Sequence, residues 1–142
     1  MNNIFVDSDI ILDLLLKREP HYFTAANMFS LVEKRKIVAY TTPVVIANIY
    51  YISARLTDKK IALENIRKLM SFLRITSVDE KILLLAMDSR FTDFEDAIQY
   101  YAAKNQGISY FITRNKSDYK VTDMTICTAA EYLKIYFLDV EE

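Results

Sequence analysis

Short apolar runs alternate with stretches of helical periodicity along the whole chain. Five runs are typical of buried strands: Asn3–Val6, Ile37–Thr41, Ile75–Val78, Ile108–Thr113 and Thr125–Cys127. Between them, apolar residues recur three and four positions apart, which predicts helices over Ile10–Leu15, Tyr22–Val32, Pro43–Leu56, Asp58–Leu73, Ile82–Ala86, Phe94–Asn105 and Ala129–Ile135. The tail Tyr136–Glu142 fits a further strand or a docked end. Alternating strands and helices predict an α/β fold with a parallel sheet covered on both faces.

Residues at the expected helix ends support this assignment. Ser8 or Asp9 can cap the first helix, and Thr42 can cap the third, whose first turn holds a proline. Residues 77–80 resemble a capping box, and Gly107 provides a left-handed residue where the sixth helix ends. The core face of the third helix is expected to consist of Val45, Ile49, Ile52 and Leu56.

Composition narrows the class of protein. The 142 residues, 52% hydrophobic and 26% charged, predict one domain spanning 1–142. A single glycine excludes a glycine-rich phosphate loop, and Cys127, the one cysteine, excludes a disulfide framework and a cysteine-based zinc site. The start lacks the pattern of a secretory signal, and the longest apolar stretch, Pro43–Ala54, is too short to span a membrane. We therefore expect a soluble cytoplasmic protein with no membrane partner.

The charge of the chain is unevenly distributed. The formal net charge is −1, with an excess of basic residues in the first half and of acidic residues in the second. A global basic field for nucleic acid is therefore absent. The local clusters at Lys34–Lys36 and Lys59–Lys60 are interpreted as solvated helix ends.

Polar residues gather at the predicted carboxyl edge of the sheet, where ligands bind in open α/β folds. The residues that follow strands or open the next helices there are Asp7, Asp9, Asn48, Asp93, Glu95, Asp96, Thr113, Arg114, Asn115 and Asp118. Carboxylates from three segments repel one another and raise their own pKa values unless a cation compensates them. A hard divalent ion with oxygen ligands, Mg²⁺ or Mn²⁺, is the natural counterion.

Several of these residues also have a purely structural interpretation. Asp7 can cap the helix that follows it, and Asp93 is a good N-cap whose partner in a capping box is Asp96. Glu95 can simply face solvent. Asn115 and Asp118 can be turn residues, and we assign no general-base role to His21, which follows Pro20 in a loop. These alternatives leave the roles open at this point.

Four segments together resemble the PIN-domain family. They are IFVDSDIILDLL, TTPVVIANIYYI, DFEDAIQYYAA and YFITRNKSDY, followed by CTAAEYL at the place of the family's terminal helix motif. The likeness is greatest to the bacterial single-domain proteins related to VapC toxins. It implies a three-layer α/β/α sandwich around a parallel sheet of four or five strands. It also implies a Mg²⁺- or Mn²⁺-dependent endoribonuclease, often neutralised by a small antitoxin protein and often a homodimer.

The resemblance also implies roles for individual residues. Asp7, Asp96 and Asp118 match the family's acidic metal ligands, and Thr113 and Asn115 match its polar partners. Asn48 stands where the family usually carries a glutamate, so one ligand charge is missing. An amide oxygen can still bind a hard ion, and Asp9 or Asp93 can supply the charge.

The chemistry so implied is in-line attack of a metal-activated water on an RNA phosphodiester. Arg114, Lys116 and Lys17 are candidates for contacts with RNA phosphates. The main alternative is a PIN fold that binds RNA or a protein without cutting, because Asn48 weakens the site. A receiver-like phosphoacceptor domain lacks a convincing aspartate and lysine pair, and a pure interaction subunit is the remaining hypothesis.

Overall fold

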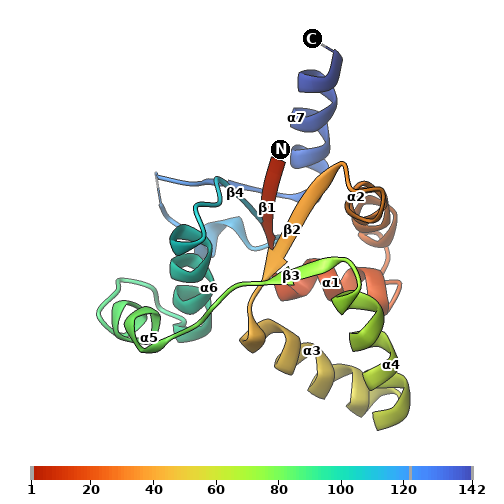
Figure 1. The fold of residues 1–142 in the computed structure, drawn as a ribbon, viewed down its shortest axis with the longest axis horizontal. Helices are drawn as coiled ribbons and strands as arrows, with labels where there is room; N and C mark the ends of the chain where they lie inside the picture. Colours follow the sequence, from red (N-terminus) through yellow and green to blue (C-terminus); the bar gives the residue numbers. More distant parts are fainter. Residues whose placement is uncertain (1, 122, 142) are drawn as a thin grey trace.

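Five parallel strands form one sheet in the spatial order β3-β2-β1-β4-β5. The computed structural model describes residues 2–121 and 123–141. Its strands are β1 (Asn2–Val6), β2 (Ile37–Thr41), β3 (Leu73–Ile75), β4 (Tyr110–Ile112) and β5 (Thr125–Cys127). The chain adds strands outward from β1 on one side and then returns to place β4 on the other (Figure 1). The strand order therefore reverses between β1 and β4, the point at which ligands bind in open α/β sheets.

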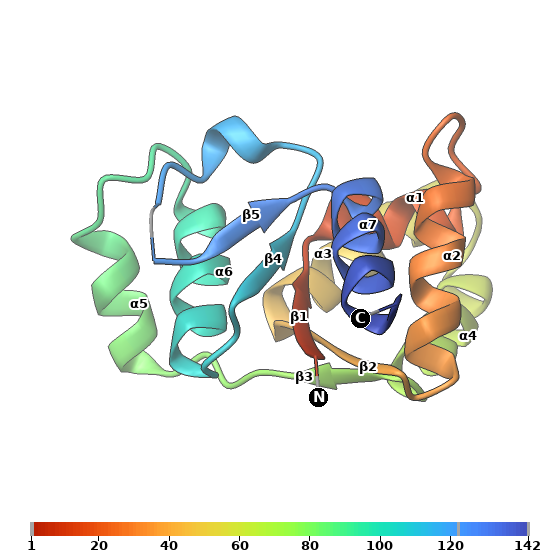
Figure 2. The same cartoon turned by 90° about the horizontal axis from the view of Figure 1, so that it is seen from above.

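Helices cover both faces of this sheet. They are α1 (Ser8–Leu15), α2 (Tyr22–Glu33), α3 (Pro43–Leu56), α4 (Lys59–Met70), α5 (Glu80–Met87), α6 (Phe94–Asn105) and α7 (Ala129–Glu141), with a short 3₁₀ turn η1 (Lys116–Asp118). Figure 2 shows α5 and α6 on one side of the sheet and α1, α2 and α7 on the other. The three-layer α/β/α fold and the five-stranded parallel sheet expected from the sequence are confirmed.

The alternation of side chains along β1 explains the two layers. Ile4 and Val6 face the larger core cluster, which contains residues of α1, α2, α3 and α7. Phe5 faces the opposite way, stacks on Phe111 of β4 with ring centroids 4.8 Å apart, and packs against α6 through Ala103. Because successive strand residues point to opposite faces, an apolar run of this kind requires a covered sheet on both sides.

Helix ends follow the sequence in part. Thr42 caps α3, accepting a hydrogen bond from the Val45 amide at 3.1 Å, as expected. Gly107 has a left-handed φ of +77° directly after α6, also as expected. Of the residues expected to be able to cap α1, Asp7 occupies that position and accepts from the Ser8 amide, whereas Ser8 and Asp9 lie within the helix. The predicted capping box was also misplaced, because Asp79 caps α5.

Other differences concern element bounds. The helix expected to reach residue 73 ends at Met70, and Leu73 instead begins a strand that pairs with Ala39 of β2. The third strand thus covers 73–75, not 75–78. The fourth strand is shorter than expected, although the Thr113 amide continues its ladder to the Cys127 carbonyl at 3.0 Å. The tail from 136 is neither a strand nor a separate docked end, because α7 continues to 141; residue 142 lies outside the described residues.

The core face of α3 also differs from the prediction. Val45 and Ile49 are buried, but Ile52 and Leu56 are exposed and Ser53 is buried in their place. A periodicity of apolar residues identifies a helix, but it does not identify which part of the helix extends beyond the sheet. No helix within residues 2–121 and 123–141 is long and apolar enough to cross a membrane.

Candidate active site

The carboxyl ends of β1 and β4 lie side by side and define the centre of the site. The Asp7 amide, directly after β1, donates to the Ile112 carbonyl at 3.0 Å. Thr113, directly after β4, is fully buried next to it and donates its hydroxyl to Asp7 Oδ2 at 2.9 Å. Two of the residues expected at this edge are therefore in contact, as parallel pairing of their strands requires.

Asp7 is a buried carboxylate surrounded by neutral donors. Its exposed fraction is 7%. Oδ1 accepts from the Ser8 amide at 2.8 Å, and Oδ2 accepts from the hydroxyls of Thr113 and Tyr119 at 2.9 and 3.2 Å. Burial, followed by the negative charge of Asp9, raises the pKa of Asp7 to about 7. A carboxylate in such an environment holds a proton or a cation more readily than an ordinary one.

Tyr119 joins Asp7 to Asp96. Its hydroxyl lies 3.2 Å from Asp7 Oδ2 and 3.0 Å from Asp96 Oδ1, and it has one proton to donate. Burial raises the pKa of Asp96 to about 6, with a smaller contribution from neighbouring carboxylates, Asp93 first, and against the hydrogen bond from Tyr119. Burial and the two carboxylates raise the pKa of Tyr119 above its ordinary range, so the phenol stays protonated. Two carboxylates with raised pKa values thus meet at one hydroxyl group.

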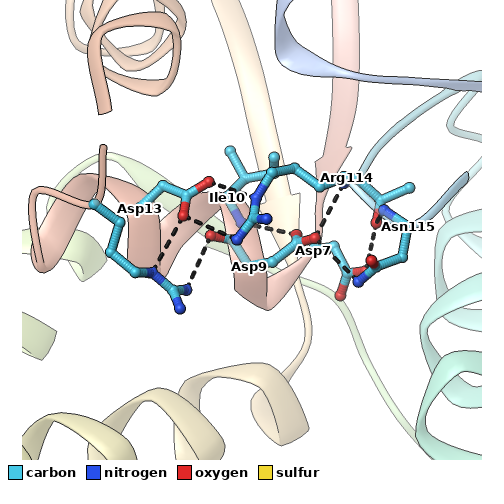
Figure 3. Close-up of polar contacts among 8 residues, drawn as sticks. Asp7, Asp9, Ile10, Asp13, Arg114 and Asn115 are labelled. Atoms are coloured by element: carbon cyan, nitrogen blue, oxygen red, sulfur yellow. Dashed lines mark hydrogen bonds and ion pairs between the residues drawn. The ribbon is translucent and has the colours of Figure 1, made fainter. Parts of the chain in front are cut away.

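Asp9 and Asn115 hold the loop after β4 in place. Asp9 Oδ2 accepts from the Arg114 amide at 3.0 Å and from Asn115 Nδ2 at 3.3 Å (Figure 3). The backbone amide of Asn115 donates to the Thr113 hydroxyl oxygen at 3.1 Å. That hydroxyl therefore accepts from Asn115 and donates to Asp7. Burial raises the pKa of Asp9, although its hydrogen bonds with the backbone oppose this.

Asp13 is a second buried carboxylate, which the sequence analysis did not select. Its side chain is 1% exposed. Arg114 approaches it with two donors, Nε at 2.8 Å and Nη2 at 3.1 Å, and Arg18 Nε lies 3.2 Å from it (Figure 3). The one signal in the sequence is that Asp9 and Asp13 lie four residues apart on α1 and thus on one face.

Asn48 contacts a carboxylate that belongs to a different helix. Its Nδ2 donates to Glu95 Oε2 at 2.9 Å, which joins α3 to the first turn of α6. Asp93 caps α6 by accepting from the Asp96 amide at 3.0 Å. Asp9 and Asp93 were the two candidates for the missing charge. Both carboxylates already accept hydrogen bonds from backbone amides. Glu95, expected to face solvent, is exposed but is the carboxylate that adjoins Asn48.

The remaining candidates lie at the periphery. Asp118 is exposed in η1, and its charge contributes to the raised pKa of Asp96. Lys116, in the same turn, pairs with Glu131 at 2.9 Å. Lys17 is exposed in the turn after α1, with a left-handed φ of 50°. His21 lies in the turn before α2 and does not contact Asp7 or Asp96 in any hydrogen bond of the described residues.

The donor set fits a divalent ion held largely by water. Within the described ranges, no three Asp, Glu, His or Cys side chains are close enough to hold a metal ion by themselves. Asp7 and Asp96, however, share one hydroxyl partner and provide hard oxygen atoms. Mg²⁺ commonly binds through one or two carboxylates and keeps several waters. The pair therefore suits Mg²⁺ or Mn²⁺ of this kind, with the water-rich remainder of the coordination shell open to substrate oxygens.

Comparisons with known proteins agree with this fold. The family model for the PIN domain matches residues 3–117. Ribonuclease VapC1 of Aquifex aeolicus is 28% identical over 134 residues, covering 91% of this chain and 92% of that protein. The structure of VapBC2 from Rickettsia felis, bound to a DNA fragment from their promoter, has a TM-score of 0.68 at 14% identity, covering 87% of this chain and 96% of that chain. A toxin–antitoxin complex from Klebsiella pneumoniae has a TM-score of 0.63 at 18% identity, covering 87% and 99%.

The Asp13 cluster yields a stability prediction. Asp13→Asn leaves two guanidinium groups without their anion, and we expect a loss of about 2–4 kcal/mol in the free energy of unfolding, because both arginines are partly exposed. The control is Lys104→Gln, which breaks the exposed pair with Asp123 and should cost at most about 1 kcal/mol. Urea denaturation measures both. Equal losses in the two variants would show that Asp13 is not a structural anchor.

The raised pKa values predict how stability varies with pH. Asp7 and Asp96 hold protons in the folded state up to about pH 7 and 6, but in the unfolded state only to about their ordinary value of 3.8. The folded protein therefore binds more protons, and the stability contributed by these groups is lost as pH rises from about 4 to about 7. For Asp7 this loss is at most about 4 kcal/mol.

The test compares urea denaturation of the wild type and Asp7→Asn in EDTA across that pH range. The wild type is expected to lose stability relative to Asp7→Asn as pH rises, while the exposed control Asp88→Asn follows the wild type. A constant difference between the wild type and Asp7→Asn would mean that Asp7 has an ordinary affinity for protons.

Proposed function

Because this chain belongs to the PIN domain family, we propose that it is a divalent-metal-dependent endoribonuclease and the toxin of a toxin–antitoxin pair. The observation that carries the proposal is the pair of buried Asp7 and half-buried Asp96, joined by Tyr119 where the strand order reverses. The relative from Aquifex aeolicus is named a ribonuclease, and one similar structure is a toxin–antitoxin complex. RNA as substrate, a small antitoxin as partner, a homodimer and a cytoplasmic location are parts of this proposal.

In this function Asp7 and Asp96 would hold Mg²⁺ or Mn²⁺ together with bound waters, and Asp118 would act on the ion through one of those waters. When bound, the ion lowers the pKa of a water that attacks the phosphodiester and neutralises charge that develops on the phosphate. Thr113 fixes the orientation of Asp7, and Asn115 fixes that of Thr113. Tyr119, which stays protonated, keeps the carboxylates of Asp7 and Asp96 at one position. Each of these groups is placed before substrate binds, which reduces the reorganisation needed for reaction.

Glu95 provides the charge that Asn48 lacks. The two side chains form one hydrogen bond at 2.9 Å, so the amide orients a carboxylate supplied by α6. We assign Asp93 a supporting role, since its carboxylate caps the helix that carries Asp96. The proposed acidic set therefore contains Glu95 in addition to the aspartates.

Phosphate contacts fall to three basic residues around this centre. The pair between Lys116 and Glu131 is exposed, so Lys116 can exchange that partner for a phosphate at little cost. Lys17 is exposed. Arg114 directs Nε and Nη2 to Asp13, which leaves its other terminal nitrogen, Nη1, to contact a phosphate of the RNA.

One observation favours a second candidate function, a PIN-fold module that binds RNA or a protein without cutting it. Within the described part of the chain, no three acidic, histidine or cysteine side chains stand close enough to hold a metal ion together. Such a module would keep the basic residues around the site but would not cleave RNA. Cleavage assays separate the two functions.

The first functional prediction concerns the acid pair. Single-turnover cleavage of a mixed RNA pool is measured across a Mn²⁺ titration. Asp7→Asn and Asp96→Asn are each expected to reduce the rate at least about 100-fold, because each removes a carboxylate that binds the ion. The exposed control Glu64→Gln, on α4, should retain the wild-type rate. An absence of cleavage by the folded wild type at saturating Mn²⁺ would favour the binding module.

The second functional prediction concerns Glu95 and Asn48. Glu95→Gln removes a charge from the site and should weaken Mn²⁺ binding measured by calorimetry. Asn48→Glu places a second carboxylate next to Glu95, so it should lower the stability of the metal-free protein by about 1 kcal/mol and strengthen Mn²⁺ binding. If Glu95→Gln left Mn²⁺ affinity unchanged, Glu95 would have no part in the metal site.

A further inference from the structure

A cavity of about 840 Å³ lies near the acid pair, and apart from Asp118 its lining residues have no role in the function proposed above. Three segments form it: residues 88–92 between α5 and α6, the middle of α6, and residues 117–121 after η1. Figure 2 shows that the loop between α5 and α6 and the segment after η1 lie on the same side of the molecule, both next to α6. The volume is in the range of sites that enclose a small organic group.

Aromatic rings form the wall of the cavity. Phe91 lies between Tyr100 and Tyr101, with ring centroids 5.3 and 6.5 Å away. Tyr100 is held rigidly, because its hydroxyl donates to the Asp123 carboxylate at 2.6 Å and Lys104 Nζ lies 5.9 Å from the centre of its ring. Phe91 and Tyr101 are only partly buried. Flat, fixed aromatic surfaces of this kind bind a nucleobase by stacking.

Two basic side chains stand at the same cavity. Arg90 and Lys120 are both exposed and line it. In the part of the chain that the structure describes, neither forms an ion pair, whereas Lys104 and Lys116 each pair with a carboxylate. Asp88 and Asp118 also line the cavity, so its rim carries both signs of charge. Proteins that bind single-stranded nucleic acid combine basic side chains, which contact the phosphates, with aromatic rings, which stack on the bases.

The residues that line the cavity adjoin the acid pair along the chain, although neither acid lines the cavity itself. Tyr100 is four residues after Asp96 on α6, so the two side chains lie on one face about 6 Å apart along the helix axis. In the other segment Tyr119 points to Asp7 and Asp96, while its neighbours Asp118 and Lys120 line the cavity. The rings of Phe91 and Tyr119 are in contact, with centroids 5.8 Å apart.

We propose that this cavity binds one unpaired nucleobase of an RNA strand, next to the phosphate that would face the ion proposed at Asp7 and Asp96. The identity of the strand as RNA rests on the proposed function. The base stacks against Tyr101 and Phe91, while Arg90 and Lys120 contact the flanking phosphates. The cavity thereby fixes the register of the strand on the protein, since a stacked base one position away determines which phosphate reaches the acids.

The test measures binding without cleavage. Fluorescence anisotropy in EDTA compares the affinity of the full-length protein for a labelled single-stranded RNA of about 12 nucleotides with that for an equally long chain of abasic ribose spacers. The wild type is expected to bind the base-bearing strand about tenfold more tightly. Tyr101→Leu, which retains bulk but loses the flat ring, should reduce this ratio to about one.

Matched variants show whether a change in the ratio of the two affinities comes from the ring of Tyr101. Tyr101→Phe keeps the ring and should keep the ratio, as should Phe23→Leu, which removes an exposed ring from α2 on the opposite side of the sheet. Arg90→Gln should weaken both strands equally and lower the salt dependence of binding by about one counterion. Circular dichroism confirms that each variant is folded.

The outcomes separate this proposal from the proposed function. An unchanged ratio in folded Tyr101→Leu, or a wild type without preference for bases, overturns the nucleobase site even if the protein cleaves RNA. If the ratio depends on Tyr101 but the protein cleaves no RNA, the nucleobase site is supported and the proposed ribonuclease function is contradicted. If Tyr101→Leu weakened the binding of a peptide but left the binding of RNA unchanged, the cavity would belong to a protein partner. That result would also overturn the proposal.

Discussion

The burial of two carboxylates at one edge of the sheet is the constraint on which the rest of the structure depends. Asp7 and Asp13 are both removed from water, and the protein balances them in opposite ways. Asp13 receives two guanidinium groups, so its charge is neutralised inside the fold. Asp7 receives only hydroxyl and amide donors, so its charge is oriented but not neutralised. An edge that satisfies one acid and leaves the next one short of positive charge is suited to an external cation.

The satisfied acid positions the unsatisfied one. Arg114 belongs to the loop after β4, and its guanidinium is held by Asp13 while its amide is held by Asp9, both on α1. These contacts fix the start of that loop, which carries the Thr113 hydroxyl to Asp7. The loop is therefore held to α1 at two points, and the side chains it presents are constrained before any ligand arrives. An ion-paired arginine acts here as a support for the site.

The sequence was sufficient for features that depend on local pattern and on chain direction. Short apolar strands between helices predicted the parallel sheet, and parallel strands necessarily brought Asp7 and Thr113 together. Residues that act through long-range contacts were not predictable in this way. The hydroxyl of Tyr119 reaches the two acids only because the segment after η1 folds back across α6, and a tyrosine among many others carries no sign of this. The exposure of Leu56 likewise reflects how far α3 extends past the sheet, which no periodicity encodes.

In the function proposed above, the pair of Asn48 and Glu95 lets the site keep its charge while a ligand position changes. A glutamate at 48 would lie within α3, away from either end of that helix. Glu95 lies in the first turn of α6, where the partial positive charge of the helix N-terminus favours a carboxylate. Moving the charge from one helix to the other therefore places it where the fold itself stabilises it, and the amide at 48 still orients it. The absence of an acid at one position is thus compatible with an acidic site, because the relevant quantity is the charge at a point in space and not the residue at a point in the sequence.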